Sequence, residues 1–292
     1  MNRNILRLAV PALGALIAEP LFLIVDAALV GHLGGTPIAG LSRASAVLQT
    51  IDGRMVFLDD STTPGVARKF GAGDPRGAVS VGIDGTWLAL ALGVVLAVVG
   101  AFAAPGLVSL FGAAPEVAAE ASIYLSISMA GLPAMLVVFA ATGLLRGLQN
   151  TITPLWVAGI GFAANALLNW LFIFGFGWGI AGSALGTVVA QWGMVLVYVV
   201  VIGRIARQHH APLRPHRAGL RGSARSGGWL FLRTVSLRVA MLLTIVVATA
   251  LGTEELAGYQ VVFTIFSTAA FALDALAIAA QALIGKSLGA GD

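Results

Sequence analysis

The chain has no cysteine among its 292 residues, which excludes disulfide bonds, thiolate metal sites and cysteine nucleophiles. Charged side chains are also scarce, at 10% of the residues, whereas 58% are hydrophobic and the mean hydropathy is +0.94. A soluble fold of this length could not bury so much apolar surface. The composition therefore predicts an all-α polytopic membrane protein, with the lipid bilayer as its first partner.

Eight apolar stretches are long enough, at about 20 residues each, to cross a hydrocarbon core of roughly 30 Å as helices. The first is not expected to be a secretory signal, because Glu19-Pro20 interrupts its apolar run and no small-residue cleavage site follows. The predicted spans fall near residues 5–30, 40–64, 86–104, 121–144, 154–175, 180–203, 228–250 and 260–285.

Lysine and arginine concentrate in alternate connections between the spans, and the connections on the opposite side contain neither. Because positive charge is retained on the cytoplasmic side of short loops, this pattern predicts a multi-pass protein of the plasma (inner) membrane with a cytoplasmic N-terminus. The most basic connection, residues 204–226, holds six arginines. Such a segment suits anionic lipid headgroups, and without interleaved aromatic residues it does not indicate a nucleic-acid partner.

The second predicted span is unusually charged. A central Asp or Arg costs about 2.5 to 3.5 kcal/mol on an insertion scale, whereas each large apolar residue returns roughly 0.3 to 0.6 kcal/mol. The segment should not insert alone, yet omitting it would place basic connections on both sides of the membrane. We therefore expect it to span as part of the folded protein. Its charged residues are Arg43, Asp52, Arg54, Asp59 and Asp60.

The chain repeats itself at an offset of 218 residues. Leu33-Gly34 recurs as Leu251-Gly252, and the loop at 71–74 recurs with the same four residues at 289–292. Six spans per copy is an even number, so both copies enter the membrane in one orientation and face each other about an axis along the membrane normal. A complete second copy would reach about residue 421. The predicted organisation is a six-helix lobe at 1–203, a basic cytoplasmic linker at 204–226, and the first two helices of an incomplete second lobe at 227–292.

Several motifs carry a family resemblance. The stretch Glu19-Pro20-Leu-Phe-Leu-Ile-Val-Asp26, followed by Val30-Gly31-His32-Leu33-Gly34, resembles the opening of the multidrug and toxic compound extrusion (MATE) transporters. Stretches at 66–74, 146–154 and 272–279 agree, and the combination is similar to the branch named after DNA-damage-inducible protein F. The resemblance implies twelve spans in two lobes, and exchange of protons or sodium ions for cationic or amphipathic compounds without any bound cofactor.

Asp26 and Glu19 lie seven residues apart in the first span, so both carboxylates project from one helix face with Pro20 between them. An ionisable residue at membrane depth is costly and usually functional, and a carboxylate can follow a proton gradient only if it can be neutralised. We predict that Asp26 is the proton or ion coupling site, and the resemblance supports this because the family's first-span acid matches Asp26. The alternative is an interhelical hydrogen bond near the outer surface. For Glu19 a structural and a functional role are both open.

Polar residues of the fifth and sixth spans are candidate partners for this acid. Asn165 and Asn169 lie one helical turn apart, as do Thr187 and Gln191, and each pair can face one cavity. Polar residues that join helices in lipid are the commoner case for the second pair. The resemblance places an acid at the position of Asn169 in many relatives, so its absence here favours protons over sodium.

Two opposite charges lie at membrane depth in the second copy, Arg238 and Asp274, and we predict that they form a structural ion pair. Thr244 occupies the position of Asp26 at the offset of 218, which confines the predicted acid chemistry to the first lobe.

The sequence as a whole predicts an antiporter that exports cationic or amphipathic compounds by alternating access. Two alternatives are open: a truncated or degenerate member that no longer transports, and a flippase for a lipid-linked substrate. A membrane-embedded enzyme fits poorly, because the histidines lie in loops without metal-ligand spacing and no Ser-His or acid pair has a catalytic separation. The histidines are His32, His209, His210 and His216.

Overall fold

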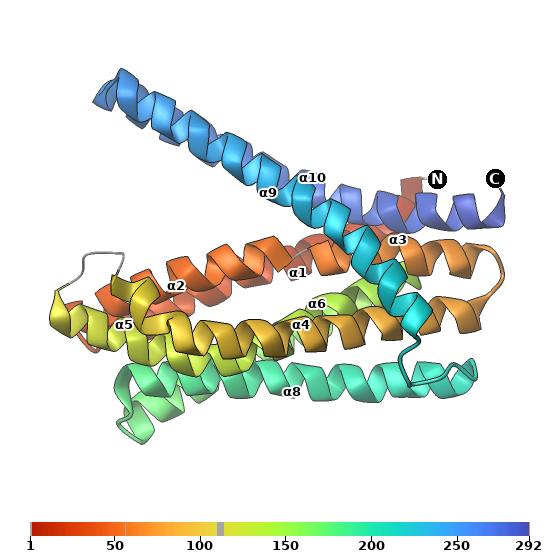
Figure 1. Ribbon diagram of the computed structural model, residues 1–292, viewed down its shortest axis with the longest axis horizontal. Helices are drawn as coiled ribbons and strands as arrows, with labels where there is room; N and C mark the ends of the chain where they lie inside the picture. Colours follow the sequence, from red (N-terminus) through yellow and green to blue (C-terminus); the bar gives the residue numbers. More distant parts are fainter. Residues whose placement is uncertain (1, 56, 110–113, 292) are drawn as a thin grey trace.

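The computed structural model describes residues 2–55, 57–109 and 114–291, apart from the side chains of 2–4, 19, 52–54, 251 and 253–257. Every regular element in these ranges is a helix. Figure 1 shows α1 to α8 as one bundle of long helices, from which α9 and α10 project at an angle. The elements are α1 (Asn2–Gly31), α2 (Gly35–Met55), α3 (Phe57–Gly71), α4 (Pro75–Ser109), α5 (Pro115–Ser128), η1 (Met129–Gly131), α6 (Leu132–Gly147), α7 (Ile152–Trp170), η2 (Leu171–Gly175), α8 (Gly179–Gln208), α9 (Arg217–Leu251) and α10 (Thr253–Ala290).

Seven helical segments of the described chain are long and apolar enough to cross a membrane, and they coincide with seven of the eight predicted spans. The span at 121–144 continues from α5 to α6 through the short 3-10 turn η1, and the span at 154–175 ends in the π-helix η2. The eighth predicted span, the charged one, is covered by α2 and α3, which flank residue 56, a position outside the described residues. Figure 1 shows α2 and α3 end to end, so that together they run the length of the bundle.

The buried charge of this span is compensated inside the protein. Asp59, only 7% exposed, accepts hydrogen bonds from Arg146 of α6 and, at 3.2 Å, from the hydroxyl of Thr63. Glycines let the two helices approach: a Cβ at Gly143 would lie 2.8 Å from the Asp59 carbonyl oxygen, and one at Gly147 would lie 2.8 Å from that of Thr63. The carboxylate that α3 could not carry into lipid alone therefore has its counter-charge on the neighbouring helix.

The two copies of the sequence repeat meet where α3 crosses α10. A Cβ at Gly71 would overlap the carbonyl oxygen of Lys286. Reciprocally, a Cβ at Gly289 would overlap the carbonyl oxygen of Arg68. Each glycine and each carbonyl has its counterpart at the offset of 218, so the contact has the reciprocity that a two-fold relation produces.

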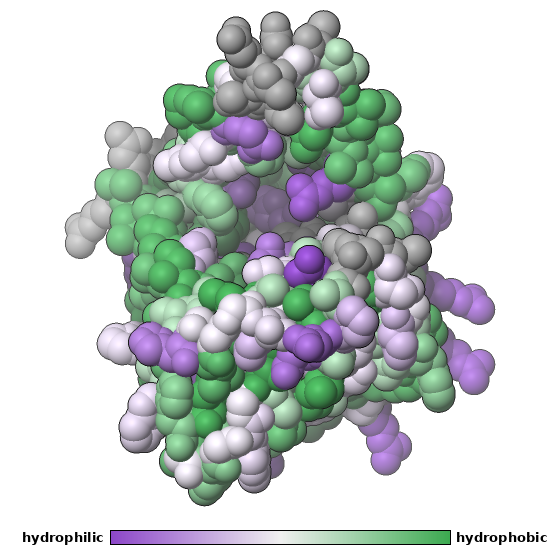
Figure 2. Space-filling view, turned by 90° about the vertical axis from the view of Figure 1, so that its left-hand side faces the viewer, coloured by the Kyte–Doolittle hydropathy of each residue, from purple (hydrophilic) through white to green (hydrophobic). Residues whose placement is uncertain are grey.

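One end of the molecule is closed by this crossing and the other is open. Both termini lie at the closed end, and α9 and α10 diverge from the bundle toward the opposite end (Figure 1). Figure 2 faces the open end and shows a hollow between the projecting helices and the bundle, with hydrophilic side chains inside it. The fold therefore creates a space between the two copies that is reached from one side.

The connection between the copies is shorter than the linker predicted at 204–226. Because α8 and α9 extend into it from both sides, only residues 209–216 lie outside helices. The backbone N–H of His216 donates to the buried carboxylate of Asp84 on α4 at 2.8 Å. This carboxylate lies at the start of α9, where the helix dipole favours negative charge. The connection is thus fixed to the bundle at the base of α9.

Replacing Gly71 with leucine is expected to loosen the closed end, because the new side chain must displace the carbonyl of Lys286, and overpacking of this kind costs about 1 to 3 kcal/mol. The measurement is the rate at which maleimide labels a cysteine introduced at Ala282, which is fully buried between α1 and α10. The chain has no cysteine of its own, so this position is the only one labelled. Labelling should be faster in the Gly71→Leu background.

Gly203→Leu is the matched control, because a Cβ at this glycine of α8 meets no atom within 4 Å. It should leave the labelling rate unchanged. Equal rates in the Gly71→Leu and unaltered backgrounds would show that the glycine contact does not hold this end closed.

Candidate functional site

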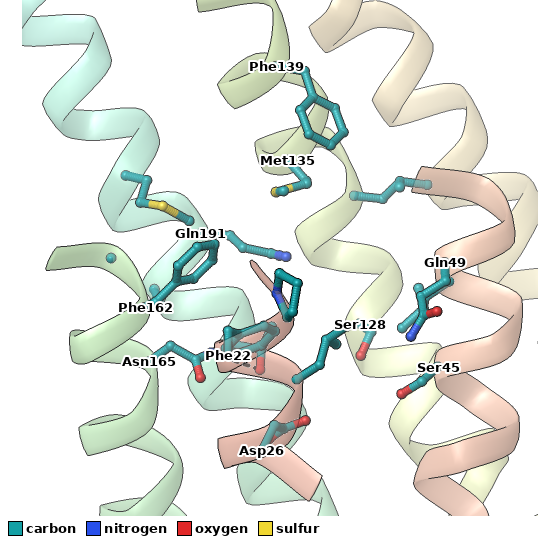
Figure 3. A pocket seen from close by; sticks show the side chains of 18 of the residues that line it. Phe22, Asp26, Ser45, Gln49, Ser128, Met135, Phe139, Phe162, Asn165 and Gln191 are labelled. Atoms are coloured by element: carbon teal, nitrogen blue, oxygen red, sulfur yellow. Dashed lines mark hydrogen bonds between the residues drawn. The ribbon is translucent and has the colours of Figure 1, made fainter. Parts of the chain in front are cut away.

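A cavity of about 370 Å³ lies between the bundle and the helix pair α9 and α10; we call it the outer cavity. Figure 3 shows side chains from α1, α2, α5, α6, α7 and α8 converging on it. Aromatic and thioether groups form much of its wall, among them Phe22, Met135, Phe139 and Phe162. The polar residues of the lining are Asp26, Ser45, Gln49, Tyr124, Ser128, Asn165, Thr187, Gln191 and Arg238.

Asp26 is the buried acid of this cavity, with 4% of its surface exposed. Its Oδ1 accepts hydrogen bonds of 2.7 Å from the amide Nδ2 of Asn169 and of 2.7 Å from the hydroxyl of Ser183. The hydroxyl of Tyr124 donates to Oδ2 at 3.3 Å. All three donors are uncharged, and in the described part of the chain no lysine or arginine forms an ion pair with this acid. Helices α1, α5, α7 and α8 thus meet at one carboxyl group.

The hydrogen bonds continue beyond the acid. Asn169 Nδ2 also donates to Asn165 Oδ1 at 3.1 Å, and Asn165 Nδ2 donates to the hydroxyl of Thr187 at 2.9 Å. Asn169 Oδ1 is buried and has no hydrogen-bond partner. A buried amide oxygen without a donor is unusual, because the desolvation of that oxygen is uncompensated.

This arrangement suits a carboxyl group that changes its protonation state. An ionised Asp26 accepts all three hydrogen bonds, whereas a protonated Asp26 must donate one. The hydroxyls of Ser183 and Tyr124 can reverse from donor to acceptor by rotation of one bond. The amide of Asn169 stays a donor in both states, because its Nδ2 also donates to Asn165 Oδ1. Each state therefore finds partners without movement of the helices.

Two features of the backbone lie beside the hydrogen-bonded network of Asp26: a pair of glycines in α8 and the π-helix η2. A Cβ at Gly182 of α8 would lie 2.8 Å from the carbonyl of Phe172, and one at Gly186 would overlap Asn169 Oδ1. This pair of glycines four residues apart lets α8 lie directly against α7, as small residues do in membrane bundles. The π-helix η2 begins two residues after Asn169, with Phe176 N–H donating to the Leu171 carbonyl at 3.0 Å.

The structure brings most of the predicted site residues together. Asn165, Asn169 and Thr187 join the hydrogen-bonded network of Asp26, and Gln191 lines the outer cavity without a bond to the acid. The backbone of Glu19 belongs to α1, but its side chain lies outside the described residues.

Two of the three residues that donate hydrogen bonds to Asp26, namely Ser183 and Tyr124, were not predicted from the sequence. Ser183 lies one helical turn before Thr187, which itself precedes Gln191 by one turn, so the spacing could have revealed it. Tyr124 offered no such signal, because it approaches Asp26 only through the packing of α5 in the folded bundle.

The predicted ion pair between Arg238 and Asp274 is not formed. The ion pairs of the described residues are those of Lys69 with Asp74, Arg146 with Asp59 and His216 with Asp84. Arg238 lines the outer cavity, whereas Asp274 lines a different cavity nearer the closed end. The two residues lie on adjacent helices but at different depths. Their opposite charges alone could not predict this difference in depth.

The chain is similar in sequence to several known proteins. A family model described as MatE matches residues 11–171. Protein DETOXIFICATION 44, chloroplastic, of Arabidopsis thaliana is 31% identical over 306 residues, which cover 100% of this chain and 58% of that protein. DNA damage-inducible protein F of Escherichia coli K12 is 25% identical over 296 residues, which cover 100% of this chain and 64% of that protein.

The fold also has solved counterparts. A structure described as the outward-facing conformation of a multidrug resistance MATE family transporter superposes with a TM-score of 0.85 at 24% identity, covering 98% of this chain and 65% of that one. This likeness confirms the predicted all-α, MATE-like fold class. The chain spans less than two thirds of the length of each of these three proteins.

Replacing Gly186 with valine is expected to push Asn169 away from Asp26, because the added Cβ would overlap the amide oxygen and lie 2.9 Å from the backbone nitrogen. We expect a loss of about 1 to 3 kcal/mol in the free energy of unfolding, seen as a lower thermal unfolding midpoint in detergent. Gly193→Val is the matched control on the same helix, since its Cβ would meet nothing within 4 Å. Equal midpoints for the two variants would contradict the close packing of α7 on α8.

Proposed function

The chain belongs to the MatE family, and on that premise we propose that it is a proton-coupled antiporter that exports cationic or amphipathic compounds by alternating access. The family is one of transporters, so the enzyme alternative is set aside. We further propose that it lies in the plasma (inner) membrane with its N-terminus in the cytoplasm. In that orientation the closed end faces the cytoplasm, where the basic connections lie, and the outer cavity opens to the outside.

The observation that carries the proposal is the environment of Asp26. Its carboxyl group is buried beside the outer cavity and held by three neutral donors. A fixed counter-charge would keep such a carboxylate ionised, whereas neutral partners that can reverse allow it to gain and lose a proton. Asp26 can therefore exchange its proton with the side to which the cavity opens.

The same geometry favours protons over sodium ions. A sodium ion needs several oxygen ligands, but the oxygens of Asp26 already accept hydrogen bonds from Asn169, Ser183 and Tyr124. A second carboxylate at the position of Asn169 could have supplied such ligands, and an amide that donates to Asp26 does not. Binding sodium here would require displacing these donors, whereas a proton requires only that one of the three hydrogen bonds reverse its direction.

The wall of the outer cavity suits amphipathic organic compounds. Phe22, Phe162 and Met135 offer apolar and aromatic contacts, while Gln49 and Gln191 offer hydrogen bonds of either sense. A cationic group on such a compound can be attracted by aromatic faces and by ionised Asp26. Arg238, on the α9 wall, would direct that group toward the α1 side. Binding of the substrate and of the proton at Asp26 are then mutually unfavourable, as exchange requires.

Two other functions remain as candidates. The charge that α3 carries at Asp59 and Asp60, within a predicted span, motivates a member of the family that does not transport. The mixed polar and apolar lining would also admit a lipid-linked substrate, which motivates the flippase alternative. The efflux experiment below separates both from the antiporter.

Asp26→Asn is expected to abolish proton-driven transport, because asparagine preserves the shape of the side chain but cannot take up a proton. The measurement is proton-dependent accumulation of a fluorescent cationic dye by inverted membrane vesicles that contain the chain. The rate in the variant should fall to that of vesicles without the protein, at equal amounts of inserted chain.

Asp74→Asn is the control, since Asp74 is an exposed carboxylate at the closed end, 3.7 Å from Lys69. It should transport at the unaltered rate. Dye transport that survives in Asp26→Asn would overturn the role of this acid. Correctly inserted chains that do not transport the dye at all would favour the non-transporting or flippase alternatives, which a lipid translocation assay distinguishes.

A further inference from the structure

A cavity of about 590 Å³ lies at the closed end, between helices of the first copy of the repeat and α10 of the second; we call it the closed-end cavity. Both charged residues of its lining are basic, Arg7 of α1 and Lys286 of α10. Leu8 and Leu283 contribute apolar surface beside them, and Ser287 contributes a hydroxyl group. The described lining therefore combines two positive charges with an apolar surface and contains no acid.

Neither of these positive charges has a counter-charge among the described residues, because their ion pairs involve other side chains. The Nζ of Lys286 lies 5.8 Å from the centre of the Phe70 ring and donates a hydrogen bond of 3.3 Å to Gln149 Oε1. A ring and an amide orient an ammonium group without neutralising it. Lys286 is thus held at the cavity with its charge available to an anion.

The backbone of Gln149, which also lines the cavity, is strained. It follows α6 in the left-handed conformation, with a φ of 63°. The turn is closed by the N–H of Asn150, which donates to the carbonyl of Leu145 at 2.8 Å, and glycine is the usual residue at the left-handed position of such a turn. Any other residue there has a conformational cost that the surrounding structure must offset. The strain indicates that the side chain of Gln149 is itself used.

The amide of Gln149 has one atom without a partner. Its Oε1 accepts from Lys286, whereas its Nε2 is buried and has no acceptor in the described part of the chain. An unpaired buried donor is unfavourable and calls for a partner such as an ion or a water molecule. An anion in the closed-end cavity supplies an acceptor for this donor and a counter-charge for Lys286 and Arg7 together.

We propose that the closed-end cavity binds a phosphate group, that of an anionic phospholipid headgroup or of free phosphate, between Arg7, Gln149 and Lys286. A phosphate group presents acceptor oxygens in several directions, which suits donors from α1, from the turn after α6 and from α10. A carboxylate has two oxygens in one plane and engages fewer of these donors. The apolar surface of Leu8 and Leu283 suits the carbon chain that a phospholipid carries next to its phosphate.

A phosphate bound here would join the two copies of the repeat. Arg7 belongs to the first copy and Lys286 to the second, so their charges repel each other across an empty cavity and are both attracted to a shared anion. In the proposed orientation the cavity faces the cytoplasmic leaflet, where anionic headgroups are found. Binding of the phosphate group itself does not rest on the proposed transport function.

The test uses the full chain purified in an uncharged detergent, without any transport measurement. Native mass spectrometry counts the bound molecules of phosphatidylglycerol, with phosphatidylcholine as the reference lipid of zero net charge. Equilibrium binding of radioactive inorganic phosphate is the second probe. Saturable binding of one phosphatidylglycerol, about tenfold tighter than that of phosphatidylcholine, identifies a lipid headgroup as the ligand. Saturable binding of inorganic phosphate alone identifies free phosphate.

The sequence repeat provides matched control variants. Arg7→Gln and Lys286→Gln should each weaken the binding of the phosphate-bearing probe by about tenfold, because each removes a charged hydrogen-bond donor. At the offset of 218 the equivalent positions hold Arg225 and Arg68, which do not line the cavity. Arg225→Gln and Arg68→Gln remove the same charge from the same side of the membrane and should bind as the unaltered chain does.

Gln149→Glu keeps the shape of the side chain but replaces the donor Nε2 by a carboxylate oxygen. The new carboxylate can pair with Lys286, so the thermal unfolding midpoint without ligand should not fall. Binding of the phosphate-bearing probe should weaken by more than about tenfold, since the anion now meets a negative charge. A role in packing alone would not separate stability from binding in this way.

The inference is overturned if neither probe saturates, or if Arg7→Gln and Lys286→Gln bind as the two control variants do. Size-exclusion profiles identical to that of the unaltered chain verify that each variant is folded. A chain that moves no dye but binds the phosphate-bearing probe, and loses that binding in Lys286→Gln, supports the closed-end cavity while the proposed transport function fails.

Discussion

The energetic cost of burying a carboxylate where water is scarce governs the arrangement of this protein. The structure meets that cost in two different ways. Asp59 is neutralised by Arg146 on the next helix, which fixes its charge and helps to hold α3 against α6. Asp26 has hydroxyl and amide donors only, so its charge is free to change. The first solution builds the bundle and the second leaves a group able to respond to a gradient.

The ion pair of Asp59 and the hydrogen bonds of Asp26 both require helices that lie very close together. Hydrogen bonds of 2.7 Å to Asp26 need the backbones of α7 and α8 to lie nearly in contact, which Gly182 and Gly186 permit. The ion pair of Asp59 depends in the same way on Gly143 and Gly147 in α6. Because lipid supplies no hydrophobic force between helices, such packing and the polar contacts it allows provide much of the stability.

Much of this could be predicted from the sequence, because the signals are local. Apolar length gives the spans, and the rarity of polar residues at membrane depth singles out Asp26, Asn165 and Asn169. The prediction that failed is the ion pair between Arg238 and Asp274, and it depends on how far each helix is shifted along its neighbours. Arg238 and Asp274 have opposite charge and suitable helices, but they lie beside different cavities. No periodicity encodes that relative depth.

The charge of the second span has no equal in the second copy. Within that span, α2 and α3 of the first copy carry Arg43, Asp59 and Asp60, whereas the corresponding part of α10 carries Asp274. Charge in the first copy therefore did not prevent the crossing of α3 and α10, because the reciprocal contact of Gly71 and Gly289 involves backbone atoms alone. A contact between backbones tolerates change in the side chains around it. The two copies can thus diverge in charge, with acids concentrated in the first, while the axis that relates them is preserved.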